Sequence, residues 1–187
     1  MLFSKKKNFA VIERQHKEDL GDGEKTVLKL NLRYPELQCS KNDPLHKFAK
    51  PFYENLSKRF LNFAKTELFN NAKNAPSTAK APFSALAKFE KSFENEDFLS
   101  ILIEFSISDG ISQPHIEKKT QTWNRSNGFL CSATDFVDEN TIKTLKKEHK
   151  RNFDKNLFVL KNNGVEFFIG DEQCFVERLD LCAEGKS

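Results

Sequence analysis

The chain lacks the short motifs that identify common enzyme classes. Its 187 residues contain no glycine-rich phosphate loop, no G-x-S-x-G nucleophile elbow and no H-E-x-x-H zinc helix. The four cysteines stand far apart, with no C-x-x-C pair, at Cys39, Cys131, Cys174 and Cys182. A zinc site needs close ligand pairs, because two donors from one turn hold half of the tetrahedron in place. We therefore expect no metal and no cofactor, and we interpret the cysteines as free thiols.

Long hydrophobic runs are also absent. No stretch approaches the roughly 18 apolar residues of a membrane-spanning helix. The N-terminus has a basic Lys5–Lys7 run but no apolar stretch after it, so we expect no signal peptide. Together with the free thiols, this predicts a cytoplasmic protein with no membrane association. The net charge of +3 comes from 30 basic and 27 acidic residues, and it bears on solubility more than on the kind of partner.

Phenylalanine is abundant, with 19 residues against one Trp and two Tyr, and most of it is expected in the core. The clearest pattern runs from Ala87 to Val137. Apolar and polar residues alternate over 98–107, which is the period of a half-buried strand. Before it, Asn95–Asp97 predicts a hairpin turn. A third strand is expected over 116–123, and Asn127-Gly128 indicates a turn into a fourth strand at Phe129.

Shorter strands are expected on both sides of this region. Two near the N-terminus join across Gly21–Gly23, and Pro35 either ends the second or places it at a sheet edge. The outward face of that second strand carries Lys29, Asn31 and Arg33. Three more strands are predicted over residues 157–161, 165–169 and 174–179.

Two helices are predicted. Asp43-Pro44 starts the first, because a carboxylate caps the first turn and proline suits its first position. Apolar residues then recur at helical spacing to about Ala72, at Leu45, Phe48, Phe52, Leu56, Phe60 and Phe63. Pro51 inside this pattern predicts a kink, or a short first helix followed by a new start. The second helix is basic, runs near 138–151 and is capped by Asp138.

These elements predict an α+β fold. Mainly antiparallel sheet or sheets, built from meander hairpins, are crossed by one long amphipathic helix and accompanied by a second, shorter helix. The length suits a single domain over residues 1–187. The composition near 71–82 predicts a flexible connection. No pattern indicates the oligomeric state.

Polar groups can converge in the loop after the central strand, residues 108–115. Asp109 and His115 would form a pair for general-base catalysis if this loop folds back. The simpler interpretation is that Asp109-Gly110 makes a turn and His115 starts a strand. Because loops carry function more often than the elements they connect, the candidate ligand-contacting residues are Asp109, Gly110, Gln113, His115 and Trp123.

Several short segments together resemble a known family. They are Tyr34-Pro35, Phe52-Tyr53, Phe60–Phe63, Pro82–Ser84, Phe98–Ile101, Thr122–Asn124, Asn127-Gly128 and Asp135-Phe136. Over roughly residues 27–180 the chain resembles the RsiV-like domain family, named after the ectodomain of a lysozyme-sensing anti-sigma factor. Related domains precede the catalytic part of some peptidoglycan deacetylases. The resemblance implies a bacterial domain of this fold, and it bears little on function because the matching residues are structural.

The central loop departs from the family pattern G-G-A-H-G. Gly110 remains, but Ile111–Pro114 replaces the rest, and Gln113 stands at the histidine position. The segment before the last strand is shortened to Gly170–Gln173. These departures imply that whatever the family loop recognises is lost or altered here. The named relatives also act outside the membrane, whereas no export signal is found in this sequence.

The absence of a nucleophile–base or metal constellation, together with the resemblance, predicts a non-catalytic binding or interaction domain. Its partner is expected to be a protein or a cell-wall-related ligand. One alternative is a small hydrolase with its site in the 108–115 loop. Another is a weak nucleic-acid binder through the basic helix over 139–151. Nucleic acid is the less expected partner, because that helix lacks interleaved aromatic residues.

Overall fold

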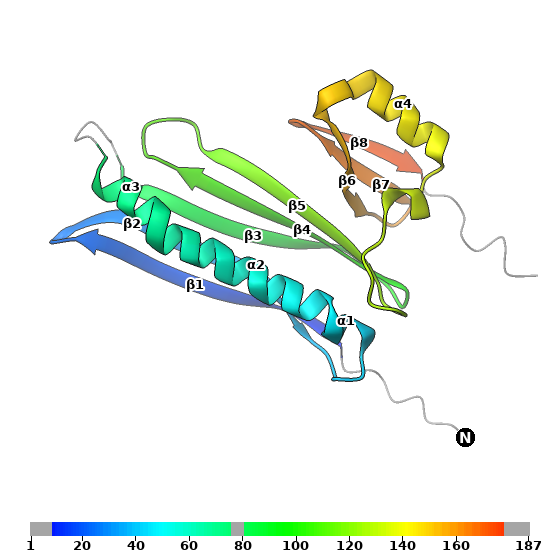
Figure 1. Cartoon of the computed structure of the whole chain (residues 1–187), viewed down its shortest axis with the longest axis horizontal. Helices are drawn as coiled ribbons and strands as arrows, with labels where there is room; N and C mark the ends of the chain where they lie inside the picture. The colour runs from blue at the N-terminus through cyan, green and yellow to red at the C-terminus, as the bar shows by residue number, and fades with distance from the viewer. Residues whose placement is uncertain (1–8, 76–80, 178–187) are drawn as a thin grey trace, which may run out of the picture. The chain divides into compact units, whose positions relative to one another are not determined.

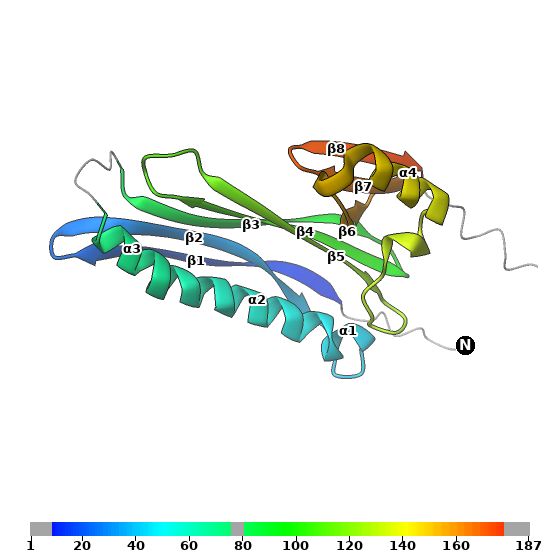
Figure 2. The ribbon, with the colours of Figure 1, turned by 45° about the horizontal axis from the view of Figure 1, so that its top comes forward.

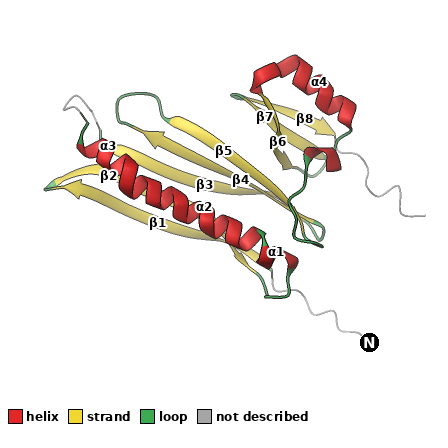
Figure 3. Cartoon of the chain, in the orientation of Figure 1, coloured by secondary structure: helices red, strands yellow, loops and turns green. Residues whose placement is uncertain are grey.

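The computed structural model describes residues 9–75 and 81–177. Five strands form one sheet in sequence order: β1 (Ala10–Asp22), β2 (Lys25–Gln38), β3 (Phe83–Glu94), β4 (Phe98–Ser108) and β5 (His115–Asn124). A three-stranded sheet follows, with β6 (Phe153–Leu160), β7 (Gly164–Ile169) and β8 (Glu172–Glu177) (Figures 1 and 3). The predicted α+β class is confirmed, with a mostly antiparallel sheet, one long helical segment and a shorter helix.

The chain divides into two compact units. The first unit contains Met1–Phe89 and Ile103–Lys118, and the second contains Glu90–Leu102 and Lys119–Ser187. Strands β3, β4 and β5 contribute residues to both. The single-domain organisation stays a prediction beside this division. Of the flexible connection expected near 71–82, residues 76–80 lie outside the described residues.

In the first unit, a helical segment follows β2 in four pieces: α1 (Pro44–Lys47), α2 (Ala49–Phe63), a π-helical turn η1 (Ala64–Leu68) and α3 (Phe69–Lys73). The predicted cap is confirmed, because the Asp43 carboxylate accepts a hydrogen bond from the Leu45 N–H at 2.9 Å. The helix restarts after Phe48, whose φ of −120° is not helical. This restart puts Pro51 in a first turn, where its missing N–H leaves no hydrogen bond unmade.

The helical segment lies along one face of the first unit's sheet (Figures 1 and 2). Ala64, Leu68 and Ala72 pack on Leu28, Leu30 and Ala85. These helical residues are four apart, so they share one side of the helix. The phenylalanines of the predicted apolar stripe lie beside these three residues and are only partly buried. One of them contacts the sheet directly, because the ring centroids of Phe60 and Phe105 lie 4.4 Å apart. Small alanines at the contact let the helix approach the sheet closely.

One strand pair departs from the antiparallel pattern. β1 and β2 form a long antiparallel hairpin, but β2 and β3 are parallel, with Leu28 opposite Phe83 and Leu32 opposite Ala87. A parallel pair needs a crossover connection, and here that connection is the long helical segment. Two alternatives were predicted for Pro35, and the first is wrong, because β2 continues through Pro35 to Gln38. Its register with β3 stops at Leu32, so Pro35 is paired on the β1 side alone.

In the second unit, α4 (Glu139–His149) covers the small sheet (Figure 1). The predicted cap Asp138 accepts hydrogen bonds from the N–H groups of Asn140 and Thr141 at 2.9 and 3.0 Å. Ser132 and Asp135 form a capping box around the short 3-10 helix η2 (Ala133–Asp135). The core is rich in phenylalanine, with Phe136, Phe158 and Phe167 at its centre.

Hydroxyl side chains tie β6 to the ends of β4 and β5 within this unit. The Leu160 N–H donates to Ser100 Oγ at 3.0 Å, and Ser100 shares a 2.9 Å hydrogen bond with Thr122. The Phe158 N–H donates to Thr120 Oγ1, which donates to the Asn156 carbonyl. Buried N–H groups of β6 thereby find partners without a neighbouring strand on that side.

The strand predicted to begin at Phe129 is not present. Instead the chain makes a single bridge between Trp123 and Leu130. The Asn124 side chain accepts from Ser126 and Asn127, and these bonds shape the turn. They hold the backbone in a compact loop instead of an extended strand.

Candidate functional site

The loop of residues 108–115 lies in the first unit and is ordered by its own hydrogen bonds. Asp109 Oδ1 accepts from the N–H groups of Ile111 and Ser112 at 2.9 and 2.7 Å. Its Oδ2 accepts from the Ser112 hydroxyl at 3.2 Å. The Gly110 N–H donates to Ser108 Oγ at 3.1 Å. The loop is therefore a preformed turn of the kind that aspartate favours.

These bonds set the chemistry of Asp109. The N–H groups of Ser112 and Ile111 hold the pKa of the Asp109 carboxyl below its usual value. A carboxylate that already accepts three hydrogen bonds and has a lowered pKa is a weak general base. Asp109 is therefore a structural residue of the loop.

Gly110 lies close to the chain just before β3. Its φ is +72°, and a Cβ atom there would lie 2.3 Å from the Ala81 carbonyl oxygen. Only glycine allows this combination of left-handed backbone and close approach. Gly110 thus positions the loop, whereas the sequence indicated only a turn.

The remaining candidates do not form a catalytic cluster. Gln113 and His115 are exposed, and His115 begins β5. No hydrogen bond joins Asp109 to His115 among the described contacts, so the pair that the hydrolase alternative requires is not assembled. Trp123 is 5% exposed and belongs to the second unit. The structure brings Asp109 and Gly110 together in one turn and leaves Gln113 and His115 pointing to solvent.

The loop instead presents apolar side chains that the candidate set omitted. Ile111 is 57% exposed and Ile116, at the start of β5, is 54% exposed. Isolated exposed isoleucines are ordinary, but here Ile111 lies within the preordered turn and Ile116 lies at the start of the strand that follows it. An apolar side chain on a preordered turn can contact another apolar surface without a large loss of conformational entropy. The sequence feature that could have indicated this apolar residue is the replacement of the family pattern by Ile111 in this loop.

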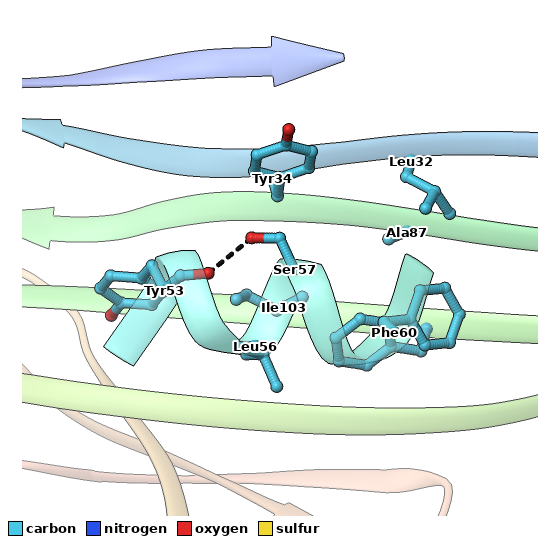
Figure 4. Close-up of a pocket in the computed structure, with 9 residues that line it drawn as sticks. Leu32, Tyr34, Tyr53, Leu56, Ser57, Phe60, Ala87 and Ile103 are labelled. Carbon is cyan, nitrogen blue, oxygen red and sulfur yellow. Dashed lines mark hydrogen bonds between the residues drawn. The ribbon is translucent and has the colours of Figure 1, made fainter. Parts of the chain in front are cut away.

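A pocket beside α2 is lined by Leu32, Tyr34, Tyr53, Leu56, Ser57, Phe60, Ala87, Ile103 and Phe105 (Figure 4). The Ser57 hydroxyl donates to the Tyr53 carbonyl one turn earlier, at 2.5 Å. The cavity volume open to water is about 10 Å³, which is room for about one water molecule. Pockets that enclose drug-sized ligands measure about 300–1,000 Å³, and room for one water molecule is too little even for a much smaller ligand. We interpret this pocket as a packing gap of the core.

The basic residues of helix α4 lie on its solvent-exposed side. Ile142 and Leu145 are buried, while the exposed side carries Lys143, Lys146, Lys147 and Glu148. Lys143 pairs with Glu139 one turn earlier at 3.5 Å. Lysines in the last turn compensate the helix dipole, so the basic residues have a structural reason independent of any phosphate partner.

The described residues offer no group of three or more His, Cys, Asp or Glu side chains that could hold a metal ion. Cys39, Cys131 and Cys174 are free thiols, and Cys182 lies outside the described residues. Burial raises the pKa of the Cys131 thiol to about 12, which leaves it unreactive. Within the described ranges, no helix is long and apolar enough to cross a membrane.

Comparison with known proteins supports the fold and little more. No family model matches the chain, and neither does any curated protein. The structure is similar to that of a DUF3298 family member from Bacteroides fragilis, with 12% identity, a TM-score of 0.53, and coverage of 92% of this chain and 90% of that one. It is also similar to a DUF3298 family protein from Pseudomonas aeruginosa, with 11% identity, a TM-score of 0.54, and coverage of 91% and 89%.

At such identities the likeness shows a shared fold. The DUF3298 label denotes a domain of unknown function, so the likeness assigns no activity to this chain. The more specific RsiV-like resemblance stays an expectation from the sequence.

Proposed function

We propose that this chain is a non-catalytic binding domain that recognises a protein partner through the loop of residues 108–116. The observation that carries the proposal is a turn whose polar groups bond to one another while Ile111 and Ile116 face solvent. Because its shape is preordered, little conformational entropy is lost when the loop docks. Apolar side chains at the centre of a contact supply most of the affinity in protein interfaces.

The RsiV-like resemblance makes lysozyme the first partner to test. We propose that the loop, although altered from the family pattern at Ile111–Pro114, still binds lysozyme, and isothermal titration calorimetry with the purified chain tests this. The Ile111→Ser/Ile116→Ser double variant should bind at least about tenfold more weakly. Leu130→Ser is the matched control, because Leu130 is also 57% exposed but lies in the second unit. No heat with lysozyme, or an equal loss in the control, contradicts the proposal.

A cell-wall-related ligand is the competing partner. Binding of soluble peptidoglycan fragments in the same calorimeter, without binding of lysozyme, would assign the recognition to a glycan or peptide. The two exposed isoleucines favour a protein, because they offer apolar area and no hydrogen-bonding groups for sugar hydroxyls.

The hydrolase alternative makes a separate prediction. Turnover of an ester or glycoside that is lost in both Asp109→Asn and His115→Gln would establish it. We expect no such turnover, since the Asp109 carboxylate is engaged by the backbone of its own turn.

We further propose that the chain is cytoplasmic, on the ground of its free thiols. Cell fractionation with thiol labelling tests this directly, and a chain found outside the membrane contradicts it. Lysozyme binding in vitro reports on the recognition surface in whichever compartment the chain occurs.

A further inference from the structure

The face of the first unit's sheet that α2 does not cover carries a hollow of about 190 Å³. Its lining residues are Asn31, Arg33, Leu86, Ala87, Lys88, Glu104 and Ser106. Asn31 and Arg33 alternate along β2 with Leu30 and Leu32. Leu30 packs among the helical residues, and Leu32 lines the pocket beside α2. Since successive side chains of a strand point to opposite faces, the hollow opens away from the helix.

Two polar groups that line the hollow have hydrogen-bond donors without a recorded protein partner in the described part of the chain: the Asn31 NH₂ group and the Arg33 guanidinium. The Lys88 ammonium pairs with Glu104 Oε1 at 2.8 Å. The Asn31 amide oxygen accepts from Gln15 Nε2 at 2.9 Å, which leaves the Asn31 NH₂ group to donate elsewhere. Arg33 is exposed and has no ion pair or hydrogen bond among the described residues.

The charges of the hollow are unequal. Arg33 and Lys88 are cations and Glu104 is the only anion in the lining, so the Lys88–Glu104 pair is neutral and one positive charge is uncompensated. The uncompensated positive charge of Arg33 would be neutralised by a ligand with a single negative charge. A dianion such as phosphate would meet the Glu104 carboxylate at close range and be repelled by it.

We propose that this hollow binds a small molecule that carries one carboxylate and a short apolar body. The Arg33 guanidinium takes the carboxylate in the two-pronged geometry that its planar fork provides. The Asn31 NH₂ and the Ser106 hydroxyl donate to the remaining lone pairs. Leu86, which is 42% exposed, contacts the apolar body.

The probe is 3-methylbutanoate, which has one carboxylate and a branched four-carbon body. Its neutral isostere 3-methylbutanamide is the ligand control. The readout is the side-chain Nε–H signal of Arg33 in ¹H–¹⁵N NMR spectra of the full chain during titration. We expect a saturable shift with the carboxylate, and at least about tenfold weaker binding of the amide, since hydrogen bonds to a charged group are the stronger ones.

Three variants separate recognition from general charge. Arg33→Gln should abolish binding. Because this variant lacks the Arg33 Nε–H signal, its binding is monitored by the backbone N–H signals of residues that line the hollow. Arg33→Lys should weaken it, because an ammonium keeps the charge but not the fork. Lys29→Gln removes a cation from the same face of the same strand, four residues from Arg33 and outside the lining, and should change affinity by less than about twofold.

Several outcomes would overturn the proposal. They are equal binding of the amide, equal loss in Lys29→Gln, and tighter binding of inorganic phosphate or an acidic peptide than of the carboxylate. The loop double variant Ile111→Ser/Ile116→Ser should leave carboxylate binding unchanged. Failure of the hollow is therefore distinguishable from failure of the lysozyme-binding loop.

Discussion

The two units bury their cores differently. In the first unit, leucine and alanine of the sheet pack against one helical segment, and the opposite face presents polar and charged side chains. In the second unit, phenylalanine rings form a core between α4 and the small sheet, and hydroxyl groups satisfy the backbone of β6. The second unit uses its buried hydroxyl groups for its own stability, whereas the first unit leaves polar donors such as Arg33 at the surface of its sheet.

This contrast explains why we place the proposed carboxylate site in the first unit. Arg33 has no partner among the described residues, and Ile111 is more than half exposed. A group with no partner inside the folded chain breaks no protein–protein hydrogen bond when a ligand replaces its bound water, so binding costs little free energy there. The reverse holds for Ser100, which is fully buried and has two partners.

The largest expected effect concerns the phenylalanine core. Phe136 is fully buried, with ring centroids of Phe98 and Phe158 at 5.1 and 6.1 Å. Phe136→Ala should lower the free energy of unfolding by about 3–5 kcal/mol in a urea titration. Phe129→Ala is the control, because Phe129 is 56% exposed, and it should cost less than about 0.5 kcal/mol. Similar losses in both variants would show that the second unit has no such core.

The loop anchor is tested by two glycines that share a left-handed backbone. Gly23 has φ +65° with nothing near its Cβ position, whereas Gly110 has φ +72° and the Ala81 oxygen at 2.3 Å. Gly23→Ala should destabilise by about 1–2 kcal/mol, the general cost of that backbone conformation. Gly110→Ala should cost at least about 1 kcal/mol more, because the chain at Ala81 must also move. Equal thermal unfolding temperatures for the two variants would rule out the anchor.

A smaller loss is expected from the hydroxyl network. Ser100→Ala leaves the buried Leu160 N–H without its acceptor, which should cost about 1–3 kcal/mol in chemical unfolding. Hydrogen exchange at the Leu160 amide should accelerate at the same time. The exposed Ser126 makes no side-chain hydrogen bond that the structure records, so Ser126→Ala should leave both measurements unchanged. Unaltered exchange at Leu160 in Ser100→Ala would refute the network.

The smallest effect is the pH dependence of the α4 cap. Hydrogen bonds from the Thr141 hydroxyl and N–H lower the pKa of the Asp138 carboxyl. A lowered folded-state pKa contributes stability that is fully present above the unfolded-state pKa and is lost as the pH falls through the folded-state value. Asp138→Asn keeps a capping oxygen but cannot titrate. The stability difference between wild type and Asp138→Asn should therefore shrink as the pH falls from about 6 to about 3, and a constant difference contradicts the cap.

Local patterns predicted most of the fold. The helix start at Asp43, the second helix after Asp138 and the hairpin at Asn95–Asp97 depend on residues within a few positions, so the sequence contains their causes. The parallel pairing of β2 with β3 could not be read in this way. It depends on how the long helical segment returns the chain to the sheet, which is a contact between distant residues.

The sequence predicted the position of the candidate loop but not the contacts that position its residues. The 108–115 loop was expected to matter, and Asp109 was expected to make a turn, which it does. The close approach of Gly110 to Ala81 involves positions far apart in sequence, so no local pattern reveals it. Arg33 was predicted to face outward, but its grouping with Lys88 and Glu104 requires the order of β2, β3 and β4 in the sheet.

Hydrogen–deuterium exchange of the full chain, with and without lysozyme, tests the central claim most directly. The account predicts slower exchange in residues 108–116 on addition of lysozyme, with residues 124–130 and α4 unchanged. Protection confined to the second unit, or no protection anywhere, would contradict a binding surface at the loop that carries Ile111 and Ile116.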